Sequence, residues 1–143
     1  MTGKRYMAID LGDVRVGIAV SDMMGIVANA LETYYRKNDE EDFAHILKLI
    51  REQNAGVVVV GLPLNMDGSK GPRALAAEEW GGKLAELTQA RVVFQDERLT
   101  TVTSERVLIE SGMRREKRKD VIDRVAATVI LQTYLDNPRK LPL

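Results

Sequence analysis

Residues 6–20 read YMAIDLGDVRVGIAV and predict the first hairpin of a β-sheet. A short apolar run ends at Asp10, and Gly12 marks a turn. Beyond the turn, apolar side chains recur at every second position between residues 14 and 20, which is typical of a strand with one buried face. The chain therefore opens with two paired strands, and an acidic residue stands where the first of them ends.

Strands and helices alternate outward from this hairpin. Residues 57–60 are four consecutive valines, apolar on both faces, which indicates a central strand covered by helices on either side. In chain order we further expect a strand over residues 30–35, a helix that opens at 38–42 and ends at 55–56, a helix over 73–89, a strand over 91–95, and helices over 101–111 and 119–136. This pattern predicts an α/β fold with a mixed sheet, in a single domain over residues 1–143.

Composition narrows the chemistry. The chain has 143 residues, no cysteine and one histidine, so a disulfide, a thiolate metal site, a His-based zinc site or a Ser-His-Asp triad is not expected. No apolar run approaches the ~18 residues that a membrane span needs, so we expect no membrane association and a cytoplasmic location. We expect His45 to be solvated on its helix and Trp80 to pack in the core.

Carboxylates are the remaining candidates for catalysis. Asp10 and Glu97 each follow a predicted buried strand, a common place for sites in α/β sheets. Asp10 also fits a turn aspartate that binds local backbone N–H groups. Glu97 also fits a solvated carboxylate paired with Arg98. Both interpretations stay open for each residue.

The last predicted helix carries two more carboxylates. Asp120, Asp123 and Ala127 are spaced at i, i+3 and i+7, beside an expected buried face of residues 122, 125, 126, 129, 130 and 133. Asp120 also suits the helix dipole, whereas Asp123 beside an apolar face needs a partner. Carboxylates from two strand ends and one helix can converge on one point, although spacing alone does not establish that. An all-oxygen site of this kind selects Mg²⁺ or Mn²⁺, which can assist phosphodiester cleavage.

Four strings occur in order: residues 8–12 (AIDLG) with 15–22 (RVGIAVSD), residues 60–68 (VGLPLNMDG), residues 96–101 (DERLTT), and Asp123 followed by 126–127 (AA) and 130–132 (ILQ). Together they resemble the YqgF/RuvX family of Holliday junction resolvases, also assigned to pre-16S rRNA processing. The resemblance implies a ribonuclease H-like fold, with a five-stranded mixed sheet whose first three strands are antiparallel, flanked by α-helices. It also implies that Asp10, Glu97 and Asp123 are the catalytic, metal-binding residues of a nuclease that uses Mg²⁺ or Mn²⁺, with Asp120 as an auxiliary ligand.

Other residues of these strings suit contacts with nucleic acid. The guanidinium groups of Arg15 and Arg98 are suited to holding a phosphate, and either also fits a structural ion pair. Asn65 and Lys70 lie in a polar loop after the central strand and can touch a sugar or phosphate, although the loop also fits an ordered surface turn.

The formal net charge of zero conceals an uneven distribution. From residue 98 to residue 119 there are seven basic and three acidic side chains, so the rest of the chain carries the compensating negative charge. The basic cluster just before Asp120 consists of Arg114, Arg115, Lys117, Arg118 and Lys119. Such clusters bind phosphate backbones with little sequence preference, so a neutral total does not exclude a nucleic-acid partner.

Three functions follow from these features. The leading hypothesis is a metal-dependent nuclease that processes the 5′ end of pre-16S rRNA on the small-subunit precursor. The first alternative is a resolvase of branched DNA, for which a homodimer is expected. The second alternative is a non-catalytic RNA-binding assembly factor. Retention of three carboxylates, which repel one another without a metal, argues against the second alternative.

Overall fold

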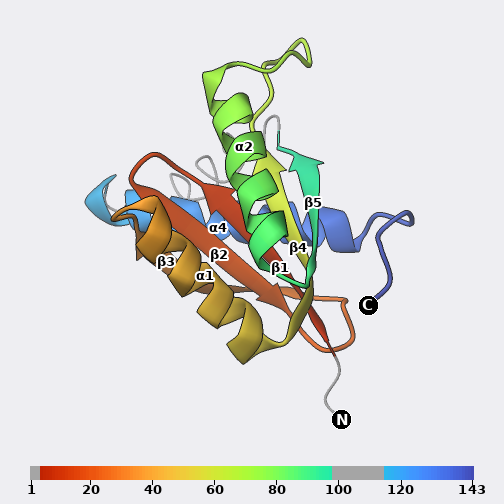
Figure 1. The fold of residues 1–143 in the computed structure, drawn as a ribbon. Coiled ribbons are helices and arrows are strands. Elements are labelled where there is room, and N and C mark those ends of the chain that lie inside the picture. The colour runs from red at the N-terminus through yellow and green to blue at the C-terminus, as the bar shows by residue number, and fades with distance from the viewer. Residues whose placement is uncertain (1–3, 98–114) are drawn as a thin grey trace.

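The computed structural model describes residues 4–97 and 115–143. Within them the elements are β1 (Arg5–Leu11), β2 (Arg15–Ser21), β3 (Ala28–Tyr35), α1 (Asp39–Gln53), β4 (Ala55–Leu62), α2 (Pro72–Leu87), β5 (Arg91–Asp96) and α4 (Arg115–Leu135) (Figure 1). The helix expected over residues 101–111 lies outside the described residues.

The strands form one five-stranded sheet in the order β3-β2-β1-β4-β5. β1, β2 and β3 pair antiparallel, whereas β4 pairs in parallel with both β1 and β5. This arrangement confirms the predicted mixed sheet with three antiparallel strands first. It also places the carboxyl ends of β1, β4 and β5 at the same edge of the sheet.

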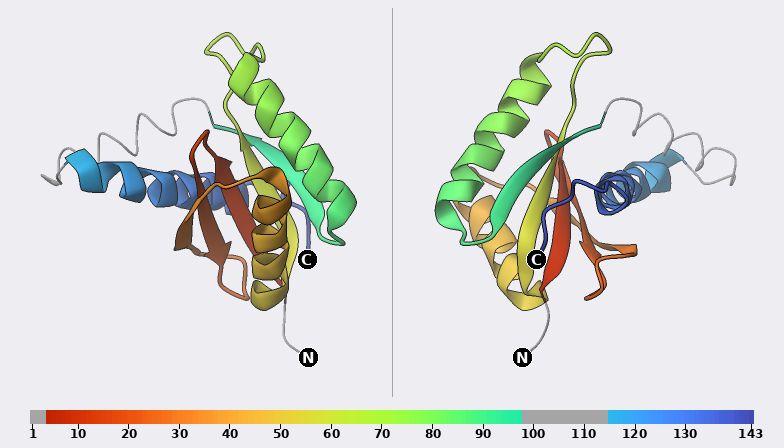
Figure 2. Two further views of the ribbon diagram at one scale, coloured as in Figure 1. Left: turned by 60° about the vertical axis from the view of Figure 1, so that its left-hand side comes forward. Right: turned by 90° about the vertical axis from the view of Figure 1, so that its right-hand side faces the viewer.

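Helices cover both faces of the sheet. Figure 2 shows α1 and α2 on one side and α4 on the other. Successive side chains of β1 point to opposite faces of the sheet. Met7 and Ile9 lie in the core under α1 and α2, whereas Tyr6 and Ala8 lie in the core under α4. The valines of β4 alternate in the same way, which confirms that β4 is a central strand.

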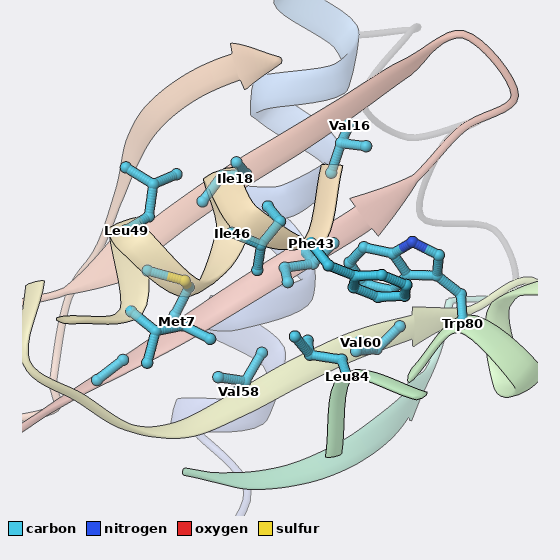
Figure 3. Close-up of a cluster of buried hydrophobic side chains, with 13 residues drawn as sticks. Met7, Val16, Ile18, Phe43, Ile46, Leu49, Val58, Val60, Trp80 and Leu84 are labelled. Atoms are coloured by element: carbon cyan, nitrogen blue, oxygen red, sulfur yellow. The ribbon is translucent and has the colours of Figure 1, made fainter. Parts of the chain in front are cut away.

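Trp80 packs in the core under α1 and α2, as its sequence position predicts. Trp80 is 5% exposed and stacks on Phe43, with ring centroids 5.0 Å apart (Figure 3). Its indole N–H is buried and has no hydrogen-bond partner among the described residues. Core packing of Trp80 is thus confirmed.

Helix α1 begins as predicted but ends one or two residues early. The Asn38 side chain accepts a hydrogen bond from the Glu41 backbone N–H and donates one to the Glu41 carboxylate, so one unpaired N–H at the helix start is capped and the capping side chain is itself held. At the other end Asn54 adopts a left-handed conformation with φ of 53° and ends the helix. Ala55 already pairs with Arg5 as part of β4, so it belongs to the strand rather than to the helix end.

The expectation that His45 is solvated is wrong. Its Nε2 atom lies 2.8 Å from Glu32 Oε2, and its ring stacks on Tyr34 at a centroid distance of 4.3 Å. Both partners come from β3, which packs against α1. The spacing of residues within the α1 sequence carries no information about that neighbour.

Helix α4 begins at Arg115, four residues before its expected start, and its buried face differs from the expected one. Thr133 is exposed, whereas Ala127 is fully buried. The buried side chains of the described part of α4 are Ala126, Ala127, Ile130, Leu131, Tyr134 and Leu135. Ala127, placed beside the core by its sequence pattern, therefore lies at its centre, because the helix packs on the sheet through its small residues.

Strand β3 begins at Ala28, two residues before the expected start. The amide of Gln132 from α4 accepts a hydrogen bond from Ala28 N and donates one to the Ile26 carbonyl. Over the described ranges, no helix combines the length and apolar character needed to cross a membrane.

Candidate active site

Two acidic residues meet at the carboxyl ends of the parallel strands. Asp10 lies near the end of β1, opposite Gly17 of β2. Glu97 directly follows β5, and its backbone N–H donates to the Leu62 carbonyl at 3.1 Å, which extends the pairing of β5 with β4. Because side chains alternate along a strand, Asp10 points to the same face as Tyr6 and Ala8, the face that α4 covers.

The two carboxyl groups are hydrogen-bonded to each other. Glu97 is only 7% exposed, and its Oε2 atom accepts no hydrogen bond from any described residue. A buried carboxylate oxygen without a partner is costly, and such atoms occur where a ligand or function requires them. The pair therefore has the character of a binding site.

Gly61 of β4 makes room for this pair. A Cβ atom at residue 61 would collide with Glu97 Oε2 and would lie 2.7 Å from Ile130 Cδ1. The absence of a side chain thus lets the Glu97 carboxyl lie between the sheet and α4. Gly61 is a site residue that its place in the motif did not reveal.

Electrostatics at the pair favour its protonated form. Burial, reinforced by the negative charge of Asp10, raises the pKa of Glu97 to about 8. The positive charge of Arg73 opposes this rise. The pair therefore favours a shared proton, because burial and the neighbouring negative charge both disfavour the ionised form of Glu97.

Arg73 was not singled out from the sequence. It lies in the first turn of α2, after the loop that follows β4, and its charge acts on Glu97. The α2 N-terminus has no side-chain cap and no acidic residue in its first turn, so the local potential is positive. The available sequence signal was a cation directly after the polar loop of a central strand.

Asp120 and Asp123 lie within α4, but their side chains are outside the described part of the structure. The backbone nevertheless fixes their register. Position 123 precedes the buried Ala127 by four residues and Ile130, which contacts the Gly61 position, by seven. These three positions share one stripe of the helix. Among the described side chains, no group of three His, Asp or Glu residues gathers as a metal cluster.

The predicted phosphate-binding residues have different surroundings. Arg15 begins β2, two residues before Gly17, the partner of Asp10, and it is half-buried. Asn65 donates to Ser69 Oγ at 2.9 Å within its own loop, and Lys70 pairs with Glu78 at 2.6 Å. Asn65 and Lys70 therefore order the loop and the start of α2, in agreement with the surface-turn interpretation.

The predicted basic cluster is only partly placed. Arg98 and Arg114 lie outside the described residues. Helix α4 includes Arg115, Lys117, Arg118 and Lys119 in its first two turns, without described side chains. These four residues of the cluster thus belong to the same helix as Asp120 and Asp123.

The mixed sheet in the order β3-β2-β1-β4-β5, covered by helices on both faces, is the ribonuclease H-like fold that resolvases share. The structure of Thermus thermophilus RuvC in complex with a Holliday junction substrate matches with a TM-score of 0.63 and 15% identity, over 98% of this chain and 99% of that one. The fowlpox virus Holliday junction resolvase matches with a TM-score of 0.56 and 15% identity, over 92% and 98% of the two chains. At such identities the likeness establishes the fold alone.

Sequence comparison identifies the family. The family described as "RuvX: Holliday junction resolvase" matches residues 4–137. A protein of Halalkalibacterium halodurans named "Putative pre-16S rRNA nuclease" is 46% identical over 92% of this chain and 96% of its own length. A protein of Halothermothrix orenii with the same name is 47% identical over 96% and 98%. The chain belongs to the RuvX family.

Proposed function

We propose that this protein is a divalent-metal-dependent nuclease that hydrolyses phosphodiester bonds near the 5′ end of pre-16S rRNA. The observation that carries the proposal is the buried, hydrogen-bonded pair of Asp10 and Glu97 at the carboxyl ends of parallel strands. The names of relatives at 46–47% identity support the substrate. A cytoplasmic location, where this precursor is made, is part of the proposal.

The residues present fit a divalent metal. Glu97 Oε2 is a buried oxygen that accepts no hydrogen bond from the described residues, and Asp10 supplies a second carboxylate beside it. A set of hard oxygen donors selects Mg²⁺ or Mn²⁺ over softer metals. Asp10, Glu97 and Asp123 would hold the metal, with Asp120 as an auxiliary ligand.

Such a metal supplies water activation and charge stabilisation for phosphodiester hydrolysis. The protein's own residues prepare the site for it. Loss of the proton that Glu97 shares with Asp10 makes both carboxylates available as charged ligands, and Gly61 leaves the space in which Glu97 lies. Arg73, whose charge acts on Glu97, and Arg15, two residues before the β2 partner of Asp10, carry guanidinium groups suited to hold phosphates.

The register of α4 supports the role of Asp123. The helix packs across the sheet with Ala127 buried and Ile130 beside Gly61, so position 123 continues that stripe by one further turn toward β2. This placement favours Asp123 over Asp120 as the third ligand, since position 120 lies a further turn along α4.

Branched DNA is the second candidate substrate. The family description names a Holliday junction resolvase, and the RuvC structure of the same fold contains such a junction. A homodimer, which a resolvase needs to cut two strands together, stays a prediction. The third candidate is an assembly factor that binds RNA without cleaving it.

The decisive experiment compares labelled pre-16S rRNA with a labelled four-way junction in Mg²⁺, Mn²⁺ or EDTA. The wild type is tested beside Asp10→Asn and a matched control, Asp13→Asn. Asp13 is exposed in the same β1–β2 turn, so its substitution makes the same chemical change outside the carboxylate pair.

We expect metal-dependent cleavage of the rRNA by the wild type and Asp13→Asn, and none by Asp10→Asn. Cleavage that survives both EDTA and Asp10→Asn would overturn the metal-dependent mechanism. Preferential cleavage of the junction would replace the rRNA substrate by branched DNA. Binding of RNA without cleavage in every metal condition would favour the assembly factor.

A further inference from the structure

Arg36 connects the β1–β2 turn, which follows Asp10, to the start of helix α1. Arg36 follows β3, and its Nη1 atom donates to the Gly12 carbonyl at 3.0 Å. Its Nε atom donates to Asp42 Oδ2 at 3.2 Å, and its backbone N–H donates to the Val14 carbonyl at 2.8 Å. Residue 36 therefore holds the β1–β2 turn at two carbonyls, one through the backbone and one through the side chain.

Asp42 fixes the direction of this arginine. It lies in the first turn of α1 and is only 1% exposed. Burial alone would raise the pKa of Asp42, but hydrogen bonds from the Lys37 backbone, the Arg36 side chain and the Tyr34 hydroxyl hold it below its ordinary value. Asp42 is therefore ionised, and it orients the planar guanidinium so that a second N–H points at Gly12.

The β1–β2 turn has few anchors of its own. A Cβ atom at Gly12 would lie 2.6 Å from the Arg15 carbonyl, so the turn is too tight for a side chain there. Asp13 and Val14 are exposed, with Val14 at 62%. Within the turn, the Gly12 N–H donates to the Arg15 carbonyl at 2.9 Å.

Gly12 lies two residues after Asp10, so a fixed position of its carbonyl restricts the backbone conformation between these two residues. We propose that Arg36, oriented by Asp42, is a positioning residue that holds the Asp10 carboxylate in its metal-binding geometry. This inference rests on the proposed function, because it assigns Arg36 to the same metal site. Groups that hydrogen-bond metal ligands commonly change metal affinity about 10–100-fold when they are removed. Arg36 acts one step further out, through the Gly12 carbonyl, so we expect an effect at the lower end of that range.

The geometry separates this role from a purely structural one. A buried ion pair can often be replaced by apolar side chains without loss of stability, so replacing Arg36 and Asp42 together can separate an effect on metal binding from an effect on stability. The bond from Nη1 to Gly12 does not contribute to neutralising Asp42. A lysine in place of Arg36 would keep a positive charge for Asp42, but its single ammonium group lacks the fork that reaches both acceptors.

The experiment measures Mn²⁺ affinity by titration calorimetry, at a pH above the pKa of Glu97, and the free energy of unfolding in EDTA. Two variants test the role. Arg36→Lys keeps the charge, and the double variant Arg36→Met/Asp42→Leu removes both charges together, so that no buried charge is left unpaired. The control is Asp22→Ala, which removes hydrogen bonds to Ile26 N and Val27 N in the β2–β3 turn, at the other end of the sheet.

We expect both Arg36 variants to bind Mn²⁺ at least about tenfold more weakly than the wild type, with a matching loss in kcat for cleavage. The double variant should show this loss even where its stability equals that of the wild type. Asp22→Ala should keep the wild-type affinity although it loses stability. Wild-type affinity in both Arg36 variants, or affinity that simply follows stability across all three, would overturn the positioning role. Failure of the wild type itself to bind Mn²⁺ would instead overturn the metal centre of the proposed function.

Discussion

The Glu97 carboxyl makes the stability of the metal-free protein depend on pH. Its pKa is raised from the ordinary 4.5 to about 8 by burial and by Asp10. Below pH 4.5 the group is protonated in both the folded and the unfolded chain, so its contribution is fully present. As the pH rises toward 8, the unfolded chain releases the proton while the folded one retains it, and stability is lost.

We therefore expect the free energy of unfolding in EDTA to fall between pH 4.5 and about 8, with a slope of at most ~1.4 kcal/mol per pH unit from this group. Glu97→Gln should flatten the curve in this window, because glutamine does not titrate. Urea denaturation at a series of pH values measures the effect. Parallel curves for the two proteins would contradict it. Saturating Mn²⁺ should stabilise the wild type most at the alkaline end, where both carboxylates are charged.

Gly61 gives a second test at the scale of one residue. In Gly61→Ala the new methyl group collides with Glu97 and Ile130, so the carboxyl must move. We expect cleavage to fall about 100-fold, because small displacements of reacting groups have effects of that size. Overpacking should also cost about 1–3 kcal/mol of stability. Activity assays and urea denaturation measure the two effects.

Gly82→Ala is the matched control for this change. It adds the same methyl group at a position with no atom within 4 Å, so its activity should equal that of the wild type. Gly61→Ala with wild-type activity and Mn²⁺ affinity would show that the Glu97 carboxyl does not need its observed position.

At the scale of elements, helix α2 contains two adjacent glycines with opposite surroundings. Gly81 faces the sheet, and a Cβ atom there would lie 2.6 Å from the Phe94 ring. Gly82 faces open space. The Phe94 ring of β5 therefore occupies the space that Gly81 leaves.

We expect Gly81→Ala to destabilise the protein by about 1–3 kcal/mol through overpacking. Gly82→Ala should stabilise it by about 0.5–1 kcal/mol, because alanine loses less conformational entropy than glycine when a helix forms. Urea denaturation of both variants and the wild type measures these changes in the free energy of unfolding. Changes of the same sign would contradict this account of how α2 packs.

Elements whose sequences carry their own signals were predictable. The valine run predicts β4, and the acidic residues at positions 39–42 predict the start of α1. The order of strands and helices along the chain then predicts the mixed sheet. Features that depend on distant partners were not predictable. His45 finds Glu32 and Tyr34 across β3, and the buried face of α4 follows from which strands it crosses. Tertiary contacts decide such features, and helical spacing does not contain them.

The same distinction between local signals and distant partners applies to the residues of the candidate site. Asp10 and Glu97 were predictable because strand ends are set by local sequence, and the structure brings them together. Gly61 and Arg36 act on the site from other elements, and their immediate sequence does not indicate a role. Arg73 has one sequence signal, its place directly after the polar loop that follows β4, but this signal does not predict an effect on Glu97. Their importance follows from the approach of α2, β4 and the β3–α1 connection to the end of β1.

At the scale of the whole molecule, the neutral net charge hides a basic segment that enters α4. If this segment contacts phosphates, substitution of Lys117, Arg118 and Lys119 by glutamine should weaken RNA binding and flatten its salt dependence. Each lost contact with single-stranded RNA reduces the slope of log K against log salt by about 0.7. Fluorescence anisotropy over a range of salt concentrations measures this slope.

The control for this prediction substitutes three cations from α1 and α2, namely Lys48, Arg51 and Lys83. It changes the net charge equally, at positions that lie along helices on the opposite face of the sheet from α4 (Figure 2). Equal effects of the two triple variants would mean that total charge, and not the basic segment, determines binding.

Helix α4 is synthesised after the strands whose apolar face it covers. All strands of the described sheet precede α4 in the chain, so a ribosome completes them before the helix that buries Tyr6, Ala8 and Val59 exists. Until then the nascent protein presents an uncovered apolar surface. Under the proposed function it also lacks Asp123, which α4 contributes to the metal site. Burial of the last core face and completion of the proposed metal site therefore depend on the same helix.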